Sequence, residues 1–126
     1  MKRCWFGAGL LALLLALSLG ITWGMEAIHR PIFQGLNRAA LSAQTGDWNN
    51  AGAELTKAEG RWKKWAHFRD CLCDHTPTEA VDGELAAART AGNLEEWSDF
   101  AVSCARAAKM VEAVGNAHAF RWWNLL

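Results

Sequence analysis

The sequence has no tyrosine, only two prolines and no excess of either charge, because 13 basic side chains balance 13 acidic ones. The lack of tyrosine and the scarcity of proline argue against a β-sandwich with its many turns. Since no basic tract or acidic tail is present, we expect no nucleic-acid partner. Alanine is abundant and apolar residues recur three and four positions apart, so we expect an all-α domain.

Patterns typical of catalysis are also missing, since we find no phosphate-binding loop and no recognisable nucleophile. Carboxylates do gather around one predicted helix corner, where acidic residues at a helix start are ordinary. They are Asp70, Asp74, Glu79, Asp82 and Glu84. We therefore expect a protein that is not an enzyme, with no catalytic residues and no cofactor.

Charge is absent from residues 4–25, a largely apolar run with leucines at its centre. A helix of roughly 20 such residues crosses the hydrocarbon of a bilayer. Trp5 and Trp23 lie near the two ends, as interfacial tryptophans do. The run favours an uncleaved anchor, because the apolar part of a signal peptide is usually about 7–15 residues long. A signal peptide cleaved near Ser18-Leu19-Gly20 and a helix buried in the core are the two alternatives.

Lys2 and Arg3 precede the apolar run, and the next basic residue is Arg30. A positively charged N-terminus tends to stay in the cytoplasm. We therefore expect a single-pass protein of the cell membrane, with residues 1–28 as the N-terminal anchor. Residues 29–126 should then form an extracytoplasmic helical bundle, for which about 100 residues suffice.

The first helix should continue beyond the anchor, although Pro31 should kink or break it. Gly46 is expected to end it and Asp47 to cap a second helix that ends near residues 74–75. The buried seam of this second helix is predicted to contain Trp48, Ala51, Leu55, Ala58, Trp62, Trp65 and Leu72, with Arg69 at the remaining position.

A third helix should start at Thr76 or Thr78, since Pro77 disfavours a helical conformation at Thr76. It should end near Gly92, with Val81, Leu85 and Ala88 facing inward. Asn93 and Glu96 suggest a capping box for the fourth helix. Its regular seam is Leu94, Trp97, Ala101, Cys104, Ala108, Val111, Gly115, His118, Trp122 and Leu125. The expected fold is one transmembrane helix followed by an antiparallel three- to four-helix bundle.

Trp122 and Trp123 would lie near the lipid headgroups at the returning end of such a bundle, or would close its bottom. In an oxidising compartment, Cys71 or Cys73 could form a disulfide with Cys104, while free buried thiols are the simpler alternative.

His67, Cys71, Asp74 and His75 form the best candidate cluster for a metal ion. No second ligand pair with recognisable zinc spacing accompanies them, so we expect no metal site.

The whole pattern resembles the domain-of-unknown-function 4363 family, which comprises small single-pass membrane proteins of clostridia and relatives. Besides the basic start and the apolar run, the similar features are Gly46-Asp47-Trp48, Ala51, tryptophan at 62 or 65, Phe68, Asp74-His75 and Asn124-Leu125-Leu126. Cys71 and Cys73 do not belong to the family pattern, so a cysteine-based role would be peculiar to this chain. The resemblance implies an architecture and a location, because the family has no established activity.

We therefore expect a membrane-anchored, non-catalytic envelope scaffold or protein-interaction module. Its partners would be membrane lipid, through the N-terminal helix, and either another protein or a second copy. The alternative function is a ligand-, metal- or thiol-sensing domain that uses the region of Cys71, Cys73 and His75.

Overall fold

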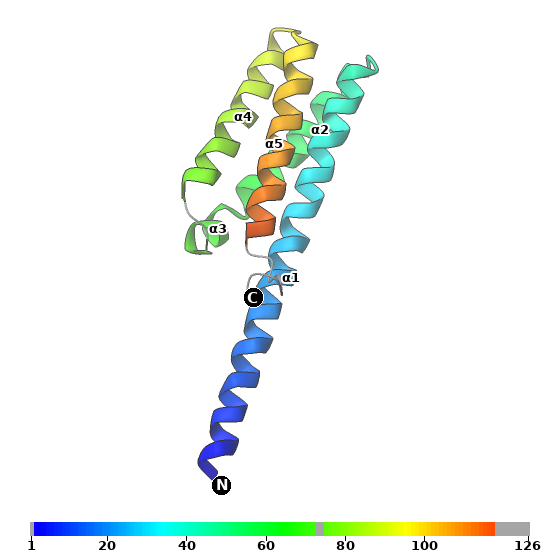
Figure 1. Ribbon diagram of the computed structural model, residues 1–126. Coiled ribbons are helices and arrows are strands. Elements are labelled where there is room, and N and C mark those ends of the chain that lie inside the picture. Colours follow the sequence, from blue (N-terminus) through cyan, green and yellow to red (C-terminus); the bar gives the residue numbers. More distant parts are fainter. Residues whose placement is uncertain (1, 73–74, 118–126) are drawn as a thin grey trace.

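The computed structural model describes residues 2–72 and 75–117, and this part of the chain is all-α (Figure 1). Its helices are α1 (Lys2–Gln44), α2 (Trp48–Lys64), α3 (Ala66–Leu72), α4 (His75–Asn93) and α5 (Trp97–Ala117). The four long helices run alternately up and down, and the short α3 connects α2 with α4. The predicted all-α fold with antiparallel helices is confirmed.

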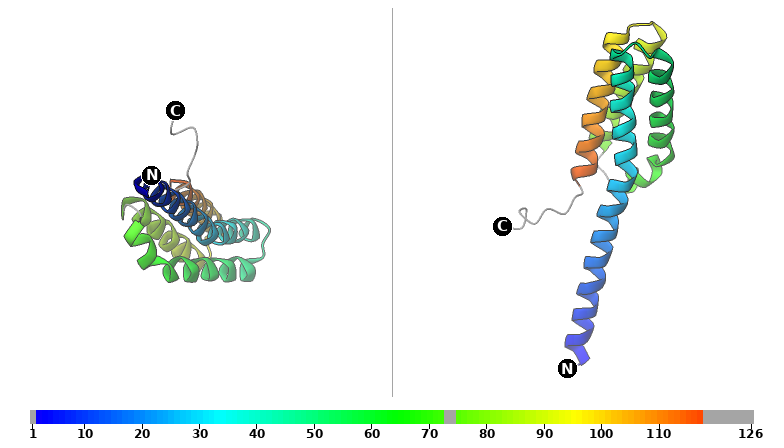
Figure 2. Two further views of the ribbon diagram at one scale, coloured as in Figure 1. Left: turned by 90° about the horizontal axis from the view of Figure 1, so that it is seen from below. Right: turned by 90° about the vertical axis from the view of Figure 1, so that its right-hand side faces the viewer.

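The bundle has a definite order of neighbours. α1 packs against both α2 and α5, and α5 also packs against α4. The backbones of α2 and α4 hardly approach each other, so these two helices flank the central pair. We call the end from which the N-terminal half of α1 projects the proximal end, and the opposite end the distal end (Figure 2).

The predicted seams largely form the core, in which small alanines let the helices approach closely. The buried residues of the predicted seams are Ala51, Leu55, Ala58 and Trp62 on α2, Val81, Leu85 and Ala88 on α4, and Ala101, Cys104, Ala108 and Val111 on α5. On α1, Ile32, Leu36, Ala39 and Ala43 are buried against them. Leu94 precedes α5 and is 62% exposed, so its place in the seam of the last helix was predicted wrongly. Trp48 and Trp65 are more than a third exposed, so the prediction that they are buried is also wrong. Both lie at an end of α2, where fewer neighbours cover a large ring.

The N-terminal half of α1 is a bare apolar rod. All side chains from Trp5 to Gly20 are exposed, and none of them packs on the bundle. This helix is long and apolar enough to cross a membrane, which is consistent with an anchor or a signal sequence. The alternative of a buried core helix is wrong for this segment.

α1 continues through Pro31 as one helix of 43 residues, so the expected break does not occur. Proline removes one backbone hydrogen bond of the helix. Here the flanking turns are held from outside, because Met25, His29 and Ile32 are all buried in the bundle. Burial begins at Met25, and a single helix therefore belongs to both the predicted anchor and the predicted bundle.

The α1–α2 connection follows the prediction. Gly46 has a φ of +82°, and the backbone N–H groups of Gly46 and Asp47 donate to the carbonyls of Ala43 and Ser42. This pattern is a Schellman motif, in which glycine adopts the left-handed conformation. The Asp47 carboxylate then accepts a hydrogen bond from the Asn50 backbone N–H at 3.2 Å, so Asp47 caps α2.

The α4–α5 connection repeats the same geometry without a glycine. Glu95 has a φ of +59°, and the N–H groups of Glu95 and Glu96 donate to the carbonyls of Gly92 and Ala91. α4 therefore ends at Asn93, and α5 begins at Trp97. The prediction that Asn93 starts the last helix with a capping box is wrong.

The predicted second helix is divided in two, because the chain turns at Trp65 between α2 and α3. The last turn of α2 carries Arg61, Lys63 and Lys64, whose charges suit the carboxyl end of a helix dipole. Beyond α3, α4 already begins at His75 with Pro77 in its first turn. The expectation that Thr76 stays non-helical is wrong, since proline is tolerated in the first turn of a helix.

Glu54 is a buried carboxylate between α1 and α2. Its oxygens accept hydrogen bonds from Lys57 at 2.9 Å and from Arg38 at 2.8 Å. The hydrogen bond from Lys57 lowers the pKa of Glu54 below its usual 4.5, burial opposes this shift, and Arg38 adds to it. This carboxylate therefore stabilises the fold only in its ionised form.

Because the pKa of Glu54 is lower in the folded chain, its stabilisation is present above pH 4.5 and is lost as the pH falls through the folded value. We expect Glu54→Gln to lower the free energy of unfolding by about 1–2 kcal/mol at pH 7. The deficit should shrink below pH 4.5, as followed by urea unfolding in detergent micelles. Glu84→Gln is the control, because the 4.0 Å contact between Glu84 and the exposed Arg106 should contribute under about 0.5 kcal/mol. A deficit for Glu54→Gln that does not change with pH would contradict this assignment.

Candidate functional site

A groove runs between α2 and α4, where the two backbones stay apart. It has a volume of about 690 Å³ and is open to solvent. Its lining residues are Glu59, Trp62, Lys63, Ala66, Arg69, Asp70, Thr78, Asp82, Leu85, Ala86, Arg89 and Thr90. We call it the α2–α4 groove. Since three basic and three acidic side chains line it, the groove has no net preference for one sign of charge.

Trp62 and Arg69 form the floor of this groove at its proximal end. Both side chains are only 1% exposed. The Arg69 guanidinium lies 3.4 Å from the centre of the Trp62 ring, and its Nη1 donates a hydrogen bond of 2.6 Å to the Trp62 carbonyl. The indole Nε1 of Trp62 donates to the Asp82 carboxylate at 2.7 Å. One tryptophan thus joins α2, α3 and α4.

A second polar bridge crosses the groove nearer its middle. Nη2 of Arg89 on α4 donates to the carboxylate of Glu59 at 2.5 Å and to the hydroxyl of Thr56 at 3.0 Å, both on α2. Arg89, Glu59 and Thr56 therefore bond to one another across the groove. This arrangement fastens α2 to α4 where apolar packing between them is sparse.

Cys104 lies behind this bridge, on the buried face of α5. Burial raises the pKa of its thiol to about 12, and the nearby carboxylate of Glu59 contributes. Within the described residues Cys104 is a free thiol, as is the exposed Cys71 on α3. The alternative disulfide partner, Cys73, lies outside the described residues.

We expect Cys104 to be inert toward iodoacetamide at pH 8 in the folded protein, because the reacting species is the thiolate. The comparison uses two variants, one that retains only Cys104 and one that retains only Cys71. Mass spectrometry should show alkylation of Cys104 at least about 1,000-fold slower than that of the exposed Cys71. In denaturant both thiols should react at similar rates. Similar rates in the folded state would contradict the burial of Cys104.

The candidate metal ligands are only partly placed. His67 and Cys71 are both exposed on α3. Asp74 and the side chain of His75 lie outside the described residues. Among the residues that are described, no group of three or more His, Cys, Asp or Glu side chains could hold a metal ion.

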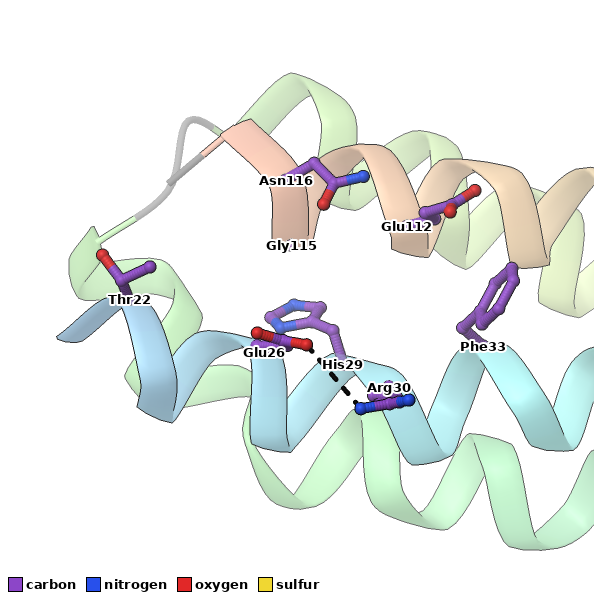
Figure 3. A pocket seen from close by; sticks show the side chains of 8 residues that line it. All are labelled: Thr22, Glu26, His29, Arg30, Phe33, Glu112, Gly115 and Asn116. Atoms are coloured by element: carbon purple, nitrogen blue, oxygen red, sulfur yellow. Dashed lines mark ion pairs between the residues drawn. The ribbon is translucent and has the colours of Figure 1, made fainter. Parts of the chain in front are cut away.

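A smaller pocket of about 280 Å³ lies between α1 and α5 at the proximal end (Figure 3). His29 occupies its inner wall, where Nδ1 lies 2.8 Å from the Met25 carbonyl. Because a carbonyl only accepts, Nδ1 carries the proton. The imidazole fits beneath Gly115, where an added Cβ would come 3.2 Å from Cβ of His29. Gly115 thus lets α5 pack closely against the buried His29. The His29 ring also meets the Trp62 ring edge to face, with ring centres 6.1 Å apart.

The tryptophans of the chain differ in their surroundings. Trp62 is buried, while Trp48 and Trp97 stack at the distal end with ring centres 4.8 Å apart. Trp5 and Trp23 are exposed on the apolar rod, and their placement at the membrane interface stays a prediction. Trp122 and Trp123 lie outside the described residues, so their placement at the membrane surface stays a prediction.

Comparison with protein-family models agrees with the start of the bundle in α1, where burial begins at Met25. A family model described as a domain of unknown function, DUF4363, matches residues 25–125. The chain belongs to the DUF4363 family. The DUF4363 match begins at Met25, the first buried residue of α1, and so covers the bundle without most of the apolar rod. No match was found among curated proteins or among solved structures.

Arg69 and Asp82 are the groove residues whose roles the sequence did not reveal. Arg69 was placed in the seam as a gap-filling residue, and Asp82 was grouped with ordinary helix-start carboxylates. The seven-residue spacing between Trp62 and Arg69 did not report their contact, because the chain turns at Trp65 and the two residues lie on different helices.

Proposed function

We propose that this DUF4363 protein is a membrane-tethered, non-catalytic module. Its N-terminus stays in the cytoplasm, and its bundle stands on the other side of the membrane, where it presents a helical surface to a protein of the cell envelope. The orientation rests on Lys2 and Arg3, which precede the apolar rod.

The observation that carries the proposal is the continuity of α1. One helix of 43 residues provides both the exposed apolar rod and the buried centre of the bundle. The segment from Trp5 to Gly24 would cover about 30 Å, the thickness of the hydrocarbon region. A bundle that grows directly from such a rod is held at a fixed height and orientation, which suits a presenting role.

The surface offered to a partner is the distal tip, which we define as Leu41, Asp47, Trp48, Leu94, Glu95, Glu96 and Asp99. Leu41, Trp48 and Leu94 are large apolar side chains that are exposed to solvent. The charged members of the tip are all acidic. Apolar side chains with a charged rim are typical of a protein-binding surface.

The non-catalytic part of the proposal is supported by the chemistry of the α2–α4 groove. Arg89 is paired with Glu59, Arg69 donates to the Trp62 carbonyl, and Trp62 donates to Asp82. The thiol of Cys104 is buried with a pKa of about 12. These groups serve to hold helices together.

The test uses membranes that contain the full-length chain with a photoreactive amino acid at Leu94. After an alkaline carbonate wash, we expect the intact chain to remain in the membrane pellet with its first residues still present by mass spectrometry. Irradiation should then give a discrete cross-linked product with another protein or with a second copy.

The matched control carries the same photoreactive residue at Ala87, an exposed position about two thirds of the way along α4. Release of the intact chain by alkali would refute the tether. Equal cross-linking from Leu94 and Ala87 would refute presentation by the distal tip.

A further inference from the structure

We propose that the proximal end of the bundle binds the anionic surface of the bilayer that α1 crosses. The binding surface, which we call the basic–aromatic end, consists of Arg61, Lys63, Lys64, Trp65, His67 and Phe68. The inference rests on the proposed function in one respect, namely that α1 is a membrane anchor.

The pairing of α1 with α2 sets the height of this surface. Turn by turn toward the proximal end, Asn50 of α2 bonds to Ser42 of α1, and Glu54 bonds to Arg38. The last such contact is that of Arg61, which donates to the Pro31 carbonyl at 3.4 Å.

Trp62 then meets His29, with ring centres 6.1 Å apart. Extending the same antiparallel pairing by one turn brings Trp65 level with Glu26 and Ala27. Glu26 is the first charged residue after the apolar rod. The basic–aromatic end therefore begins at the height where hydrocarbon gives way to headgroups.

The side chains at this height have the composition of a membrane interface. Trp65 is 37% exposed and Phe68 is 39% exposed, and their rings meet edge to face at 6.2 Å. Nζ of Lys64 lies 5.7 Å from the centre of the Trp65 ring. Exposed aromatic rings beside lysines and arginines are characteristic of segments that insert at the headgroup level.

The charge of the surface selects anionic lipid. Arg61, Lys63 and Lys64 are exposed together in the last turn of α2. Of the described acidic residues, Asp70 lies on α3, Glu79 lies near the start of α4, and Glu112 on α5 lines the proximal pocket beside Glu26. Glu26 is already paired with Arg30 at 3.8 Å, as Figure 3 shows. The basic side chains are therefore concentrated on the end of α2, and such clusters are attracted to anionic headgroups.

The turn at Trp65 gives this surface its orientation. α2 ends at Lys64, and α3 begins at Ala66 at the proximal end of the bundle, where Figure 1 labels it. A straight continuation of α2 would have carried Phe68 down the side of α1 into the hydrocarbon layer. The division into two helices instead keeps the Trp65–Phe68 pair and the lysines together at the boundary.

The test measures the membrane depth of a nitroxide label on Cys71, an exposed residue one turn beyond Phe68. Full-length protein with Cys4→Ser, Cys73→Ser and Cys104→Ala is reconstituted in nanodiscs of equal parts phosphatidylglycerol and phosphatidylcholine. We expect the ratio of collisions with oxygen to collisions with a water-soluble nickel chelate to be about threefold higher at Cys71 than at a label on Asn49→Cys, at the distal end.

Two changes should remove the difference between these sites. One is replacement of phosphatidylglycerol by phosphatidylcholine, and the other is the double substitution Lys63→Gln and Lys64→Gln. A ratio at Cys71 equal to that at Asn49 in the anionic nanodiscs would overturn the proposal. A high ratio at Cys71 that is unaffected by both changes would overturn recognition by charge.

A third label, on Leu14→Cys within the apolar rod, separates this inference from the proposed function. If Leu14→Cys is shielded from the nickel chelate while Cys71 behaves as a site in water, only the further inference fails. If Leu14→Cys is itself accessible to the chelate, the anchor fails, and the proposed function fails with it.

Discussion

Trp62→Ala should lower the free energy of unfolding by about 3–5 kcal/mol, the largest effect expected of any single substitution in the bundle. The side chain is 1% exposed and links α2 to three other helices, through Arg69 on α3, Asp82 on α4 and His29 on α1. Its removal leaves a cavity and takes away the partner of a buried guanidinium. Urea unfolding in detergent micelles, followed by circular dichroism, measures the change.

Two variants give this prediction its controls. Trp65→Ala removes the same side chain three residues later, where the ring is 37% exposed, and should cost no more than about 1–2 kcal/mol. Trp62→Phe keeps most of the packing but loses the hydrogen bond to Asp82, and should cost about 1–2 kcal/mol. Equal losses for Trp62→Ala and Trp65→Ala would contradict the packing described for α2.

Arg69→Lys should be nearly as damaging as Arg69→Ala, with a loss of about 2–4 kcal/mol. The guanidinium does two things at once, since it stacks flat on the Trp62 ring and donates to the Trp62 carbonyl. A lysine ammonium is compact and strongly hydrated, so it cannot reproduce a planar stacked contact in a buried site. The same unfolding measurement applies.

The control for this substitution is Arg61→Lys, at an exposed arginine in the last turn of α2. It should change stability by less than about 0.5 kcal/mol. A double-mutant cycle between Trp62→Ala and Arg69→Ala should show strong coupling, because each substitution removes the other residue's contact. Additive losses would mean that the stacked geometry contributes no stability.

The helical seams could be predicted because they depend on a repeated local pattern. Apolar residues three and four apart on α2, α4 and α5 identified residues such as Leu55, Leu85 and Val111, and all three are buried. The connection at Gly46 was equally readable, since glycine there supplies the positive φ of +82°. The apolar rod was also clear from composition alone.

The α4–α5 connection was predicted incorrectly because Gly92 is required for helix packing and does not supply the positive φ of the turn. Gly92 lies where an added Cβ would come 3.1 Å from the Phe100 ring, so it serves the close packing of α4 on α5. The left-handed residue of that turn is Glu95, a residue type that seldom adopts this conformation. The predicted end near Gly92 was right to within one residue, whereas no local signal reported the turn after it or the start of α5 at Trp97.

The α2–α4 groove could not be predicted from the sequence for a similar reason. The burial of Arg69 depends on the turn at Trp65 and on the indole surface that Trp62 offers from the preceding helix. Its partner Asp82 comes from α4, and a pairing of residues 20 positions apart cannot be read from periodicity. Polar bridges between helices are set by their relative placement, which only the assembled fold defines.

The unbroken passage of α1 through Pro31 makes the molecule a lever. In the proposed membrane orientation, the part of α1 from Met25 to Gln44 would rise about 30 Å above the bilayer. Transmembrane helices commonly tilt by about 20°, and a tilt of that size would swing the far end sideways by roughly 10 Å. Bilayer thickness would thus set how far across the membrane plane the far end of the rod can reach.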